Sequence, residues 1–116
     1  MSTPIQNYVY RQYIHCAGRR NISFELSIET FLQIAAGACV YCLATNSNTA
    51  KRKQYAVKTW TYNGVDRVNS DLAYTTGNCV SCCKQCNAAK AAQDLYTFLG
   101  SDWLAETIEE MKTWYA

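Results

Sequence analysis

The chain has 116 residues and a formal net charge of +2, with seven cysteines, five glycines and one proline. This length suits one domain, residues 1–116, and the low content of proline and glycine excludes a low-complexity or disordered chain. A net charge so close to zero identifies no partner by itself, so any case for nucleic acid depends on where the cations lie.

The cysteines indicate metal binding rather than a disulfide scaffold. Their number is odd, and the start of the chain, MSTPIQNY, lacks the charged and apolar segments of a signal peptide. No apolar run is long enough to cross a bilayer, so we expect no membrane contact and a reducing, cytoplasmic setting. In such a setting, C-x-x-C pairs favour a metal over disulfides.

Two amphipathic helices are predicted within residues 4–37. Ser2 or Thr3 can cap the first helix, and Pro4 stands at its first position, where a missing N–H costs nothing. Ser27 can cap the second helix. Apolar residues recur at helical spacing in both segments, which predicts one buried face for each.

Short strands are predicted in the middle of the chain. Residues 44–54 are polar and rich in turn formers, so they predict a loop, and residues 55–62 are rich in the residue types of strands. Asn63-Gly64 then predicts a two-residue hairpin turn leading into a strand over residues 65–68.

The last third of the chain is predicted to form one short strand and two helices. The strand covers residues 78–81, and the first helix begins around Asn87. Asp94 or Ser101 can cap the next helical segment, and a final helix is expected over residues 102–115. Its buried face is predicted from apolar spacing at Leu104, Ile108, Met111 and Tyr115.

Two cysteine pairs are predicted to bind one structural zinc. Zinc prefers four tetrahedral ligands, and two C-x-x-C turns are a common way to supply them. Cys39 and Cys42 form the first pair, and we favour Cys83 and Cys86 as the second because they precede a helix. The alternative second pair and the remaining cysteine are expected to be small buried apolar residues: Cys79, Cys82 and Cys16.

The sequence resembles small phage-type HNH endonucleases over roughly residues 16–99. The resemblance lies in the two cysteine pairs and in several short motifs: Gly18-Arg19-Arg20-Asn21, Val65-Asp66-Arg67-Val68, Asn78-Cys79-Val80, and Cys86-Asn87 with Lys90. It implies an α+β fold with a ββα-metal core over residues 38–93 and flanking helices. It also implies a phage-encoded, metal-dependent DNA endonuclease that acts in the cytoplasm of the host cell.

The resemblance implies a role for each residue that matches the motif. Asp66 and Asn87 would contact a catalytic Mg²⁺ or Mn²⁺ against a DNA phosphate, and Asn78 would fix the loop or orient residue 67. Carboxylate and amide oxygens are suitable ligands for such ions. Taken singly, Asp66 could instead be a hydrogen-bonding turn residue and Asn87 a helix cap.

Arg67 departs from the family pattern, which has a histidine general base at this position. A guanidinium stays protonated, so Arg67 cannot accept a proton from water, although it can hold a phosphate. Water could be activated by the metal or by the substrate phosphate, a base could come from elsewhere, or cleavage could be lost while binding remains. His15, the only histidine, has a suitable pKa for a base but is predicted to lie on the first helix.

The cations suggest a basic face for DNA, and the acids of the last helix suggest an acidic back. The candidate DNA-binding residues are Arg19, Arg20, Lys51, Arg52, Lys53, Lys84 and Lys90. Ordinary solvation of exposed loops explains the run from Lys51 to Lys53 equally well. The alternative function is therefore a catalytically silent zinc module that binds nucleic acid or a host protein, and a further one is a zinc-ribbon interaction domain without DNA.

Overall fold

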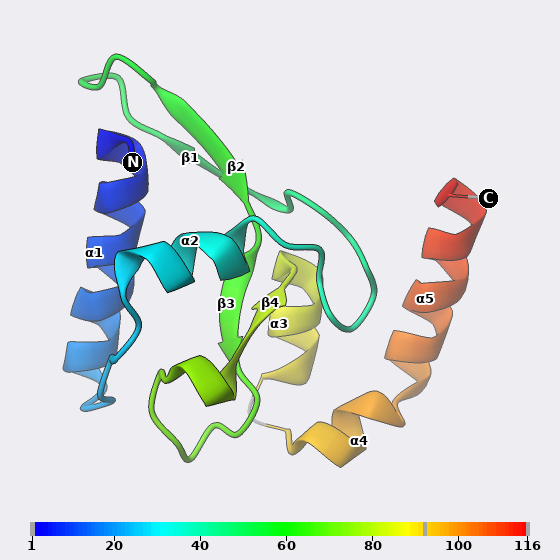
Figure 1. Ribbon diagram of the computed structural model, residues 1–116. Helices are drawn as coiled ribbons and strands as arrows, with labels where there is room; N and C mark the ends of the chain where they lie inside the picture. Colours follow the sequence, from blue (N-terminus) through cyan, green and yellow to red (C-terminus); the bar gives the residue numbers. More distant parts are fainter. Residues whose placement is uncertain (1, 92, 116) are drawn as a thin grey trace.

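The chain, in a computed structural model that describes residues 2–91 and 93–115, folds into helices around two small antiparallel sheets (Figure 1). This mixture confirms the predicted α+β class. The elements are α1 (Pro4–Arg19), α2 (Ile28–Ala35), β1 (Asn48–Lys51), β2 (Thr59–Tyr62), β3 (Gly64–Arg67), the 3-10 helix η1 (Thr76–Asn78), β4 (Cys79–Cys82), α3 (Lys84–Lys90), α4 (Leu95–Leu99) and α5 (Asp102–Tyr115).

The first two helices begin where local capping predicts. The Thr3 hydroxyl accepts from the Gln6 backbone N–H at 3.3 Å, and the Gln6 side chain accepts from the Thr3 N–H at 2.9 Å. Ser27 caps α2 by accepting from the Thr30 N–H at 3.2 Å. Each cap satisfies donors that the first turn of a helix leaves unpaired.

The ribbon of β1 and β2 differs from the prediction. Residues 48–51, predicted as loop, form β1, and only residues 59–62 of the predicted strand form β2. The two pair antiparallel, with Ala50 opposite Trp60. Trp60 packs against the core beneath α1 and so fixes β2 in place. Residues 48–51 then pair with β2 as a strand, although this polar segment has a low strand propensity of its own.

The predicted hairpin turn at Asn63-Gly64 is wrong. The strands on either side belong to different sheets, since β2 pairs with β1 and β3 pairs with β4. Neither Asn63 nor Gly64 has the positive φ that a type I′ turn requires. The chain therefore passes directly from one sheet to the other.

Asn63 is instead a fully buried bridge between three segments. Its Nδ2 donates to the carbonyls of Gly37 at 2.8 Å and Ala44 at 2.9 Å. Its Oδ1 accepts from the Ser47 hydroxyl at 2.8 Å and from the Ser47 N–H at 3.2 Å. The amide thus ties the end of α2 and the segment before β1 to the start of β3.

Replacing Asn63 by alanine is expected to destabilise the fold by about 2–4 kcal/mol, because buried groups lose their partners. Chemical denaturation would measure the loss. Asn63→Asp is the second variant to measure. It would be tolerated in a hairpin turn, where Asp-Gly serves as well as Asn-Gly, but it should destabilise a buried bridge, because aspartate lacks the two N–H donors of the amide. A nearly neutral Asn63→Asp would contradict the bridge.

The core of the molecule is the unit β3–β4–α3. In the antiparallel pair Asp66 lies opposite Val80, and Arg67 lies opposite Cys79. Helix α3 begins at Lys84 rather than around Asn87, because the Cys83 sulfur accepts from the Cys86 N–H at 3.3 Å and caps the helix. Asn87 is therefore in the middle of α3 and is not a cap.

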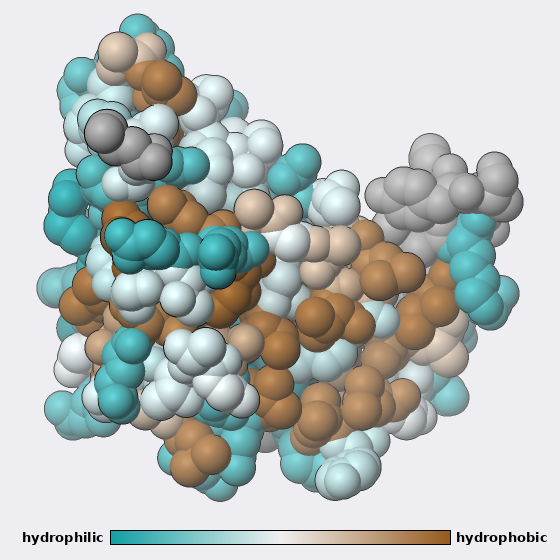
Figure 2. All heavy atoms as spheres, viewed as in Figure 1, coloured by the Kyte–Doolittle hydropathy of each residue, from teal (hydrophilic) through white to brown (hydrophobic). Residues whose placement is uncertain are grey.

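Two apolar clusters lie on either side of this unit. One joins the cysteines to Phe98 of α4 and Leu104 of α5, and the other joins α1 and α2 to Val65. On the face shown in Figure 2, hydrophobic surface is concentrated between the central strands and the helices α4 and α5. Leu104 is buried and Ile108 packs against the first cluster, as predicted; Met111, Trp114 and Tyr115 lie outside the described side chains.

Candidate metal centre and phosphate pocket

Four buried cysteines converge at the start of α3. The ligand sulfurs of Cys39, Cys42, Cys83 and Cys86 all lie within 4.8 Å of one another, and those of Cys42 and Cys83 are 3.6 Å apart. Four sulfurs about 2.3 Å from one tetrahedral ion would be about 3.8 Å apart, so this set fits a metal. The four predicted ligands are therefore in position to bind a metal ion.

The turn that carries the first pair is closed by backbone hydrogen bonds. The Leu43 N–H donates to the Cys39 carbonyl at 2.8 Å, and the Cys39 N–H donates to the Ala44 carbonyl at 2.8 Å. Leu43 has a φ of 70°, the left-handed conformation that lets the chain reverse after Cys42. This local geometry aims both sulfurs of the pair inward.

The proximity of the thiols changes their acidity. Hydrogen bonds from the thiols of Cys82 and Cys83 lower the pKa of Cys39. The hydrogen bond to Cys39 raises the pKa of Cys83 to about 11 and also raises that of Cys86. These hydrogen bonds thus favour ionisation of Cys39 over that of Cys83 and Cys86. Because cysteine binds a metal as the thiolate, metal binding would release protons from the cluster.

The remaining cysteines have different surroundings. Cys79 and Cys82 are buried in β4, as expected, and burial raises the pKa of Cys79 to about 11. The expectation that Cys16 is also buried is wrong, because it lies on the exposed side of α1. The buried residues of that helix are Ile5, Val9 and Ala17, so its inward face does not include Cys16.

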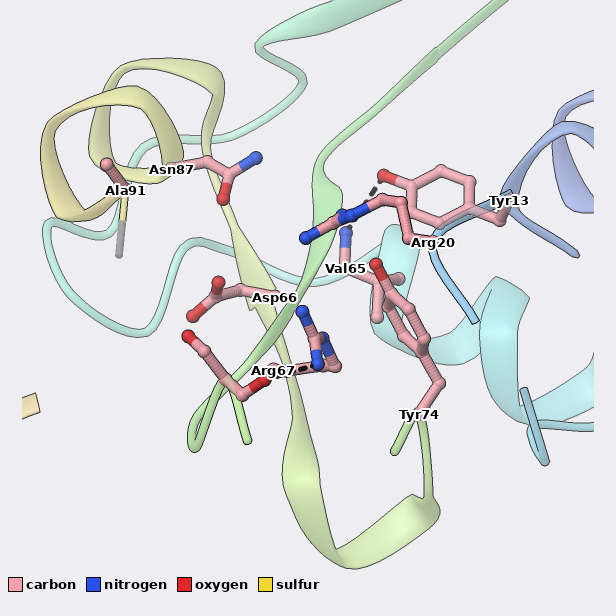
Figure 3. A pocket seen from close by; sticks show the side chains of 9 residues that line it. Tyr13, Arg20, Val65, Asp66, Arg67, Tyr74, Asn87 and Ala91 are labelled. Atoms are coloured by element: carbon pink, nitrogen blue, oxygen red, sulfur yellow. Dashed lines mark hydrogen bonds between the residues drawn. The ribbon is translucent and has the colours of Figure 1, made fainter. Parts of the chain in front are cut away.

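Asp66 and Asn87 line one cavity of about 370 Å³ between β3, α3 and α1 (Figure 3). Asp66 comes from the middle of β3, and Asn87 comes from the exposed side of α3. The side chains of both reach into the same space. The other residues that line it are Tyr13, Arg20, Val65, Arg67, Ser70, Tyr74 and Ala91.

The carboxylate of Asp66 is held by two partners. Its Oδ2 accepts from the Tyr41 hydroxyl at 3.0 Å and lies 3.3 Å from the Lys90 Nζ. Burial, together with the charge of Asp66, raises the pKa of Tyr41, so this phenol stays a donor. Because Tyr41 lies between the cysteines of the first pair, this hydrogen bond connects the cysteine cluster to the cavity.

Lys90 is not on the DNA-facing surface that the sequence suggested. Its side chain is 1% exposed, and its Nζ also donates to the Arg67 carbonyl at 3.2 Å. A lysine at the end of a short basic helix is typical of a surface cation, but α3 packs this face against β3. Lys90 therefore neutralises Asp66 from inside the protein.

Arg67 is buried and its guanidinium is fixed. Nη1 donates to the carbonyls of Ser70 at 2.6 Å and Leu72 at 2.9 Å, and the guanidinium carbon lies 5.2 Å from the centre of the Tyr74 ring. The group stays protonated, so it contributes a fixed positive charge to the cavity wall.

Asn78 holds the loop between β3 and β4. Its Oδ1 accepts from the Asn69 N–H at 2.9 Å, and its Nδ2 donates to the carbonyls of Asn69 and Ala73, each at 3.0 Å. All its amide groups are used inside the protein, and it does not line the cavity. Its hydrogen bonds close the loop whose carbonyls position the guanidinium of Arg67.

Several residues of the cavity were not predicted from sequence. Tyr13 accepts a hydrogen bond from the Val65 N–H at 3.2 Å, and burial raises its pKa to about 12. The Tyr74 ring lies beneath the guanidinium of Arg67, and Arg20 was predicted as a DNA-binding residue but not as part of this cavity. His15 is exposed and does not line the cavity. Tyr41, which contacts Asp66 without lining the cavity, was not predicted either, although its position between two ligand cysteines was a usable signal.

The other cations predicted to bind nucleic acid are accessible. Arg19, Arg20, Lys51, Lys53 and Lys84 are exposed. Arg52 is half-buried, with its guanidinium carbon 4.1 Å from the centre of the Tyr8 ring. In the described part of the chain, no helix is long and apolar enough to cross a membrane.

Comparison with known proteins shows a shared fold. No protein-family model matches the sequence. An uncharacterized protein of Acanthamoeba polyphaga mimivirus is 29% identical over 90 residues, which are 78% of this chain and only 15% of the viral protein. The structure of the rare-cutting HNH restriction endonuclease PacI matches with a TM-score of 0.65 and 18% identity, over 95% of this chain and 79% of the PacI chain. The chain therefore shares the fold of an HNH endonuclease.

Proposed function

We propose that this chain is a metal-dependent endonuclease that hydrolyses phosphodiester bonds in DNA. One observation carries the proposal: Asp66 and Asn87 line the same cavity as two arginines, Arg20 and Arg67. Carboxylate and amide oxygens suit a hard divalent cation, and guanidinium groups suit phosphate. The fold shared with an HNH restriction endonuclease supports the same chemistry.

The donor set fits Mg²⁺ or Mn²⁺. Among the described residues, the Tyr41 hydroxyl and the Lys90 ammonium both approach Oδ2 of Asp66, which leaves Oδ1 for a cation. The amide of Asn87 is on an exposed residue of α3 and borders the same space. Asp66 and Asn87 would hold the ion, which when bound stabilises charge on the scissile phosphate. Arg67 would orient that phosphate and stabilise its charge.

Zinc is the proposed metal of the cysteine cluster. Four thiolates in a closed, buried set are the ligands of structural zinc sites. Its role would be to hold the turn of Cys39 and Cys42 against the start of α3. Tyr41 would then be fixed where its hydroxyl reaches Asp66.

The distribution of charge supports a DNA partner. Between Glu29 and Asp66 the sequence contains no acidic residue, and this stretch carries the cations of the β1–β2 ribbon and of the turn at its tip. The acids of α5, by contrast, lie at the other end of the chain. We assign the DNA-binding surface to three groups of cations. They are the exposed Arg19 and Arg20 near the cavity, the run Lys51, Arg52 and Lys53 of the ribbon, and Lys84 at the start of α3.

Plasmid nicking in Mg²⁺ or Mn²⁺ tests the function. Asn87→Ala is expected to lower the cleavage rate by at least about 100-fold, because it removes a ligand of the ion. Asp66→Ala is expected to abolish cleavage. Gln85→Ala is the matched control for Asn87, since it deletes an exposed amide from the same helix without touching the cavity. Manganese binding measured by electron paramagnetic resonance should weaken in parallel.

A binding module is the second candidate, because Arg67 stands where the related pattern has a proton acceptor. Salt-dependent DNA binding without cleavage in either metal would favour that module over the endonuclease. Equal activity of Asn87→Ala and Gln85→Ala would remove Asn87 from the ion site. The viral relative supports a viral origin, such as a phage. We propose that the protein then acts in the cytoplasm of the host cell.

A further inference from the structure

A second pocket adjoins the proposed phosphate cavity. It has a volume of about 270 Å³ and lies between α1 and the β1–β2 ribbon. We call it the tyrosine groove; the residues that define it here are Tyr8, Gln12, Tyr13, Cys16, Tyr62 and Tyr74. The volume is just below the range of about 300–1,000 Å³ for whole small-molecule ligands, so it suits one planar ring system.

The tyrosine groove shares two lining residues with the phosphate cavity. Tyr13 and Tyr74 line both, so each ring forms part of the wall between the proposed phosphate position and the groove. Both rings are held in place by the protein: Tyr13 contacts Phe31 edge-on at 5.0 Å between centroids, and Tyr74 packs against Phe24 at 5.1 Å. A strand bound at the phosphate cavity would therefore pass directly beside the groove.

Two cations lie near residues of the groove. The guanidinium carbon of Arg52 lies 4.1 Å from the centre of the Tyr8 ring, and that of Arg67 lies 5.2 Å from the centre of the Tyr74 ring. The lining itself is aromatic and aliphatic, with the amide of Gln12 as a hydrogen-bonding group, and it includes neither arginine. An apolar slot with cations nearby suits a base whose flanking phosphates stay outside the slot.

We infer that the tyrosine groove binds a single unstacked base of the DNA strand whose phosphate occupies the cavity. This inference rests on the proposed DNA substrate. Stacking on aromatic rings offsets the cost of taking the base out of the helix, and it tolerates any base because each has a flat π-face. The Gln12 amide can bond to the edge of the base and so favour some bases over others.

Cys16 provides a direct probe, because it lines the groove and is exposed, whereas the other six cysteines are buried. The rate at which N-ethylmaleimide modifies Cys16 is measured by peptide mass spectrometry on the full chain, with zinc bound in the cysteine cluster. A single-stranded DNA oligonucleotide, added without Mg²⁺ or Mn²⁺, is expected to slow the reaction at least about fivefold. An oligonucleotide of the same length that has abasic sites throughout should leave the rate unchanged.

Each other result would overturn the inference. Equal protection by the base-containing and abasic strands would mean that the backbone alone covers Cys16. Bound DNA without protection, with binding verified by fluorescence anisotropy, would mean that the groove stays open. Protection that grows with protein concentration instead would identify a second copy of the chain as the occupant.

A filled groove provides the second test. Cys16→Trp should weaken binding of the normal oligonucleotide at least about fivefold and leave binding of the abasic one unchanged. Ile14→Trp is the matched control, since it places the same side chain on an exposed position of α1 outside the groove. Equal binding by the two variants contradicts the inference.

The failure of the inference and the failure of the endonuclease proposal can be told apart. If the wild type nicks DNA with a metal while Cys16→Trp and Ile14→Trp bind the oligonucleotide equally well, the endonuclease proposal stands and the base-binding groove is refuted. If bases protect Cys16 but the protein nicks no DNA, the base-binding groove stands and the endonuclease proposal is refuted.

Discussion

Replacing Cys83 by serine is expected to unfold the protein at ordinary temperature. Binding of a structural zinc is worth about 10–16 kcal/mol in small zinc domains, which equals or exceeds the total stability of about 5–15 kcal/mol of a typical domain. Cys83 is one of the four sulfurs of the cluster, and a serine at this position can still cap α3, so the substitution removes the metal ligand alone. Elemental analysis of the wild type should give about one zinc per chain.

The control for Cys83 is Cys79, which is equally part of the buried core but lies outside the cluster. Cys79→Ser should cost only about 1–3 kcal/mol, the usual penalty of a buried hydroxyl without a good partner. Thermal unfolding measures both, and a zinc chelator should reproduce the Cys83 effect in the wild type. If Cys79→Ser proved the more harmful change, the assignment of the metal ligands would be wrong.

Replacing Lys90 by methionine is expected to cost about 3 kcal/mol. Removing one partner of a buried ion pair costs about 3–5 kcal/mol because the other charge stays buried without compensation. The lower end applies here, since Asp66 borders the cavity and keeps its hydrogen bond from Tyr41. Urea denaturation measures the change. Lys84→Met is the matched control, because Lys84 is exposed on the same helix and should change stability by less than about 0.5 kcal/mol.

Magnesium should partly rescue the Lys90 variant. A ligand stabilises the folded state according to its concentration relative to its dissociation constant. Without the ammonium, Asp66 attracts a divalent cation more strongly, so the same Mg²⁺ concentration should raise the unfolding free energy of Lys90→Met more than that of the wild type. An identical Mg²⁺ response in both proteins would argue against a cation at Asp66.

The turn of Cys39 and Cys42 is connected to the proposed ion site through the contacts of Asp66. Tyr41 contributes its hydroxyl from between two cluster cysteines, and Lys90 contributes its ammonium from α3. Both reach the same carboxylate oxygen, Oδ2. A metal bound by the cysteine cluster would therefore also fix Tyr41, whose hydroxyl donates to Oδ2 of Asp66.

Sequence predicted the metal cluster well because its determinants are local. A C-x-x-C turn aims two sulfurs at one point, and a cysteine at a helix start can cap that helix. Local geometry also decides which of two C-x-x-C pairs supplies the second set of ligands, Cys79 with Cys82 or Cys83 with Cys86. A strand such as β4 sends neighbouring side chains to opposite faces, whereas the turn into α3 brings its two sulfurs together.

The amino-acid sequence by itself thus determined a first helix start at Ser2 or Thr3, a second at Ser27, and the four sulfur ligands, since caps and turns depend on residues a few positions apart. The α+β class followed from the resemblance to a known family. Only the tertiary structure decided the partners of the strands, the burial of Asn63 and Lys90, and the tyrosine groove beside the cavity. Those features depend on contacts between distant segments, such as the Tyr41 hydroxyl on Asp66. A hydrogen bond or a salt bridge across such distances leaves no pattern in the spacing of residues along one segment.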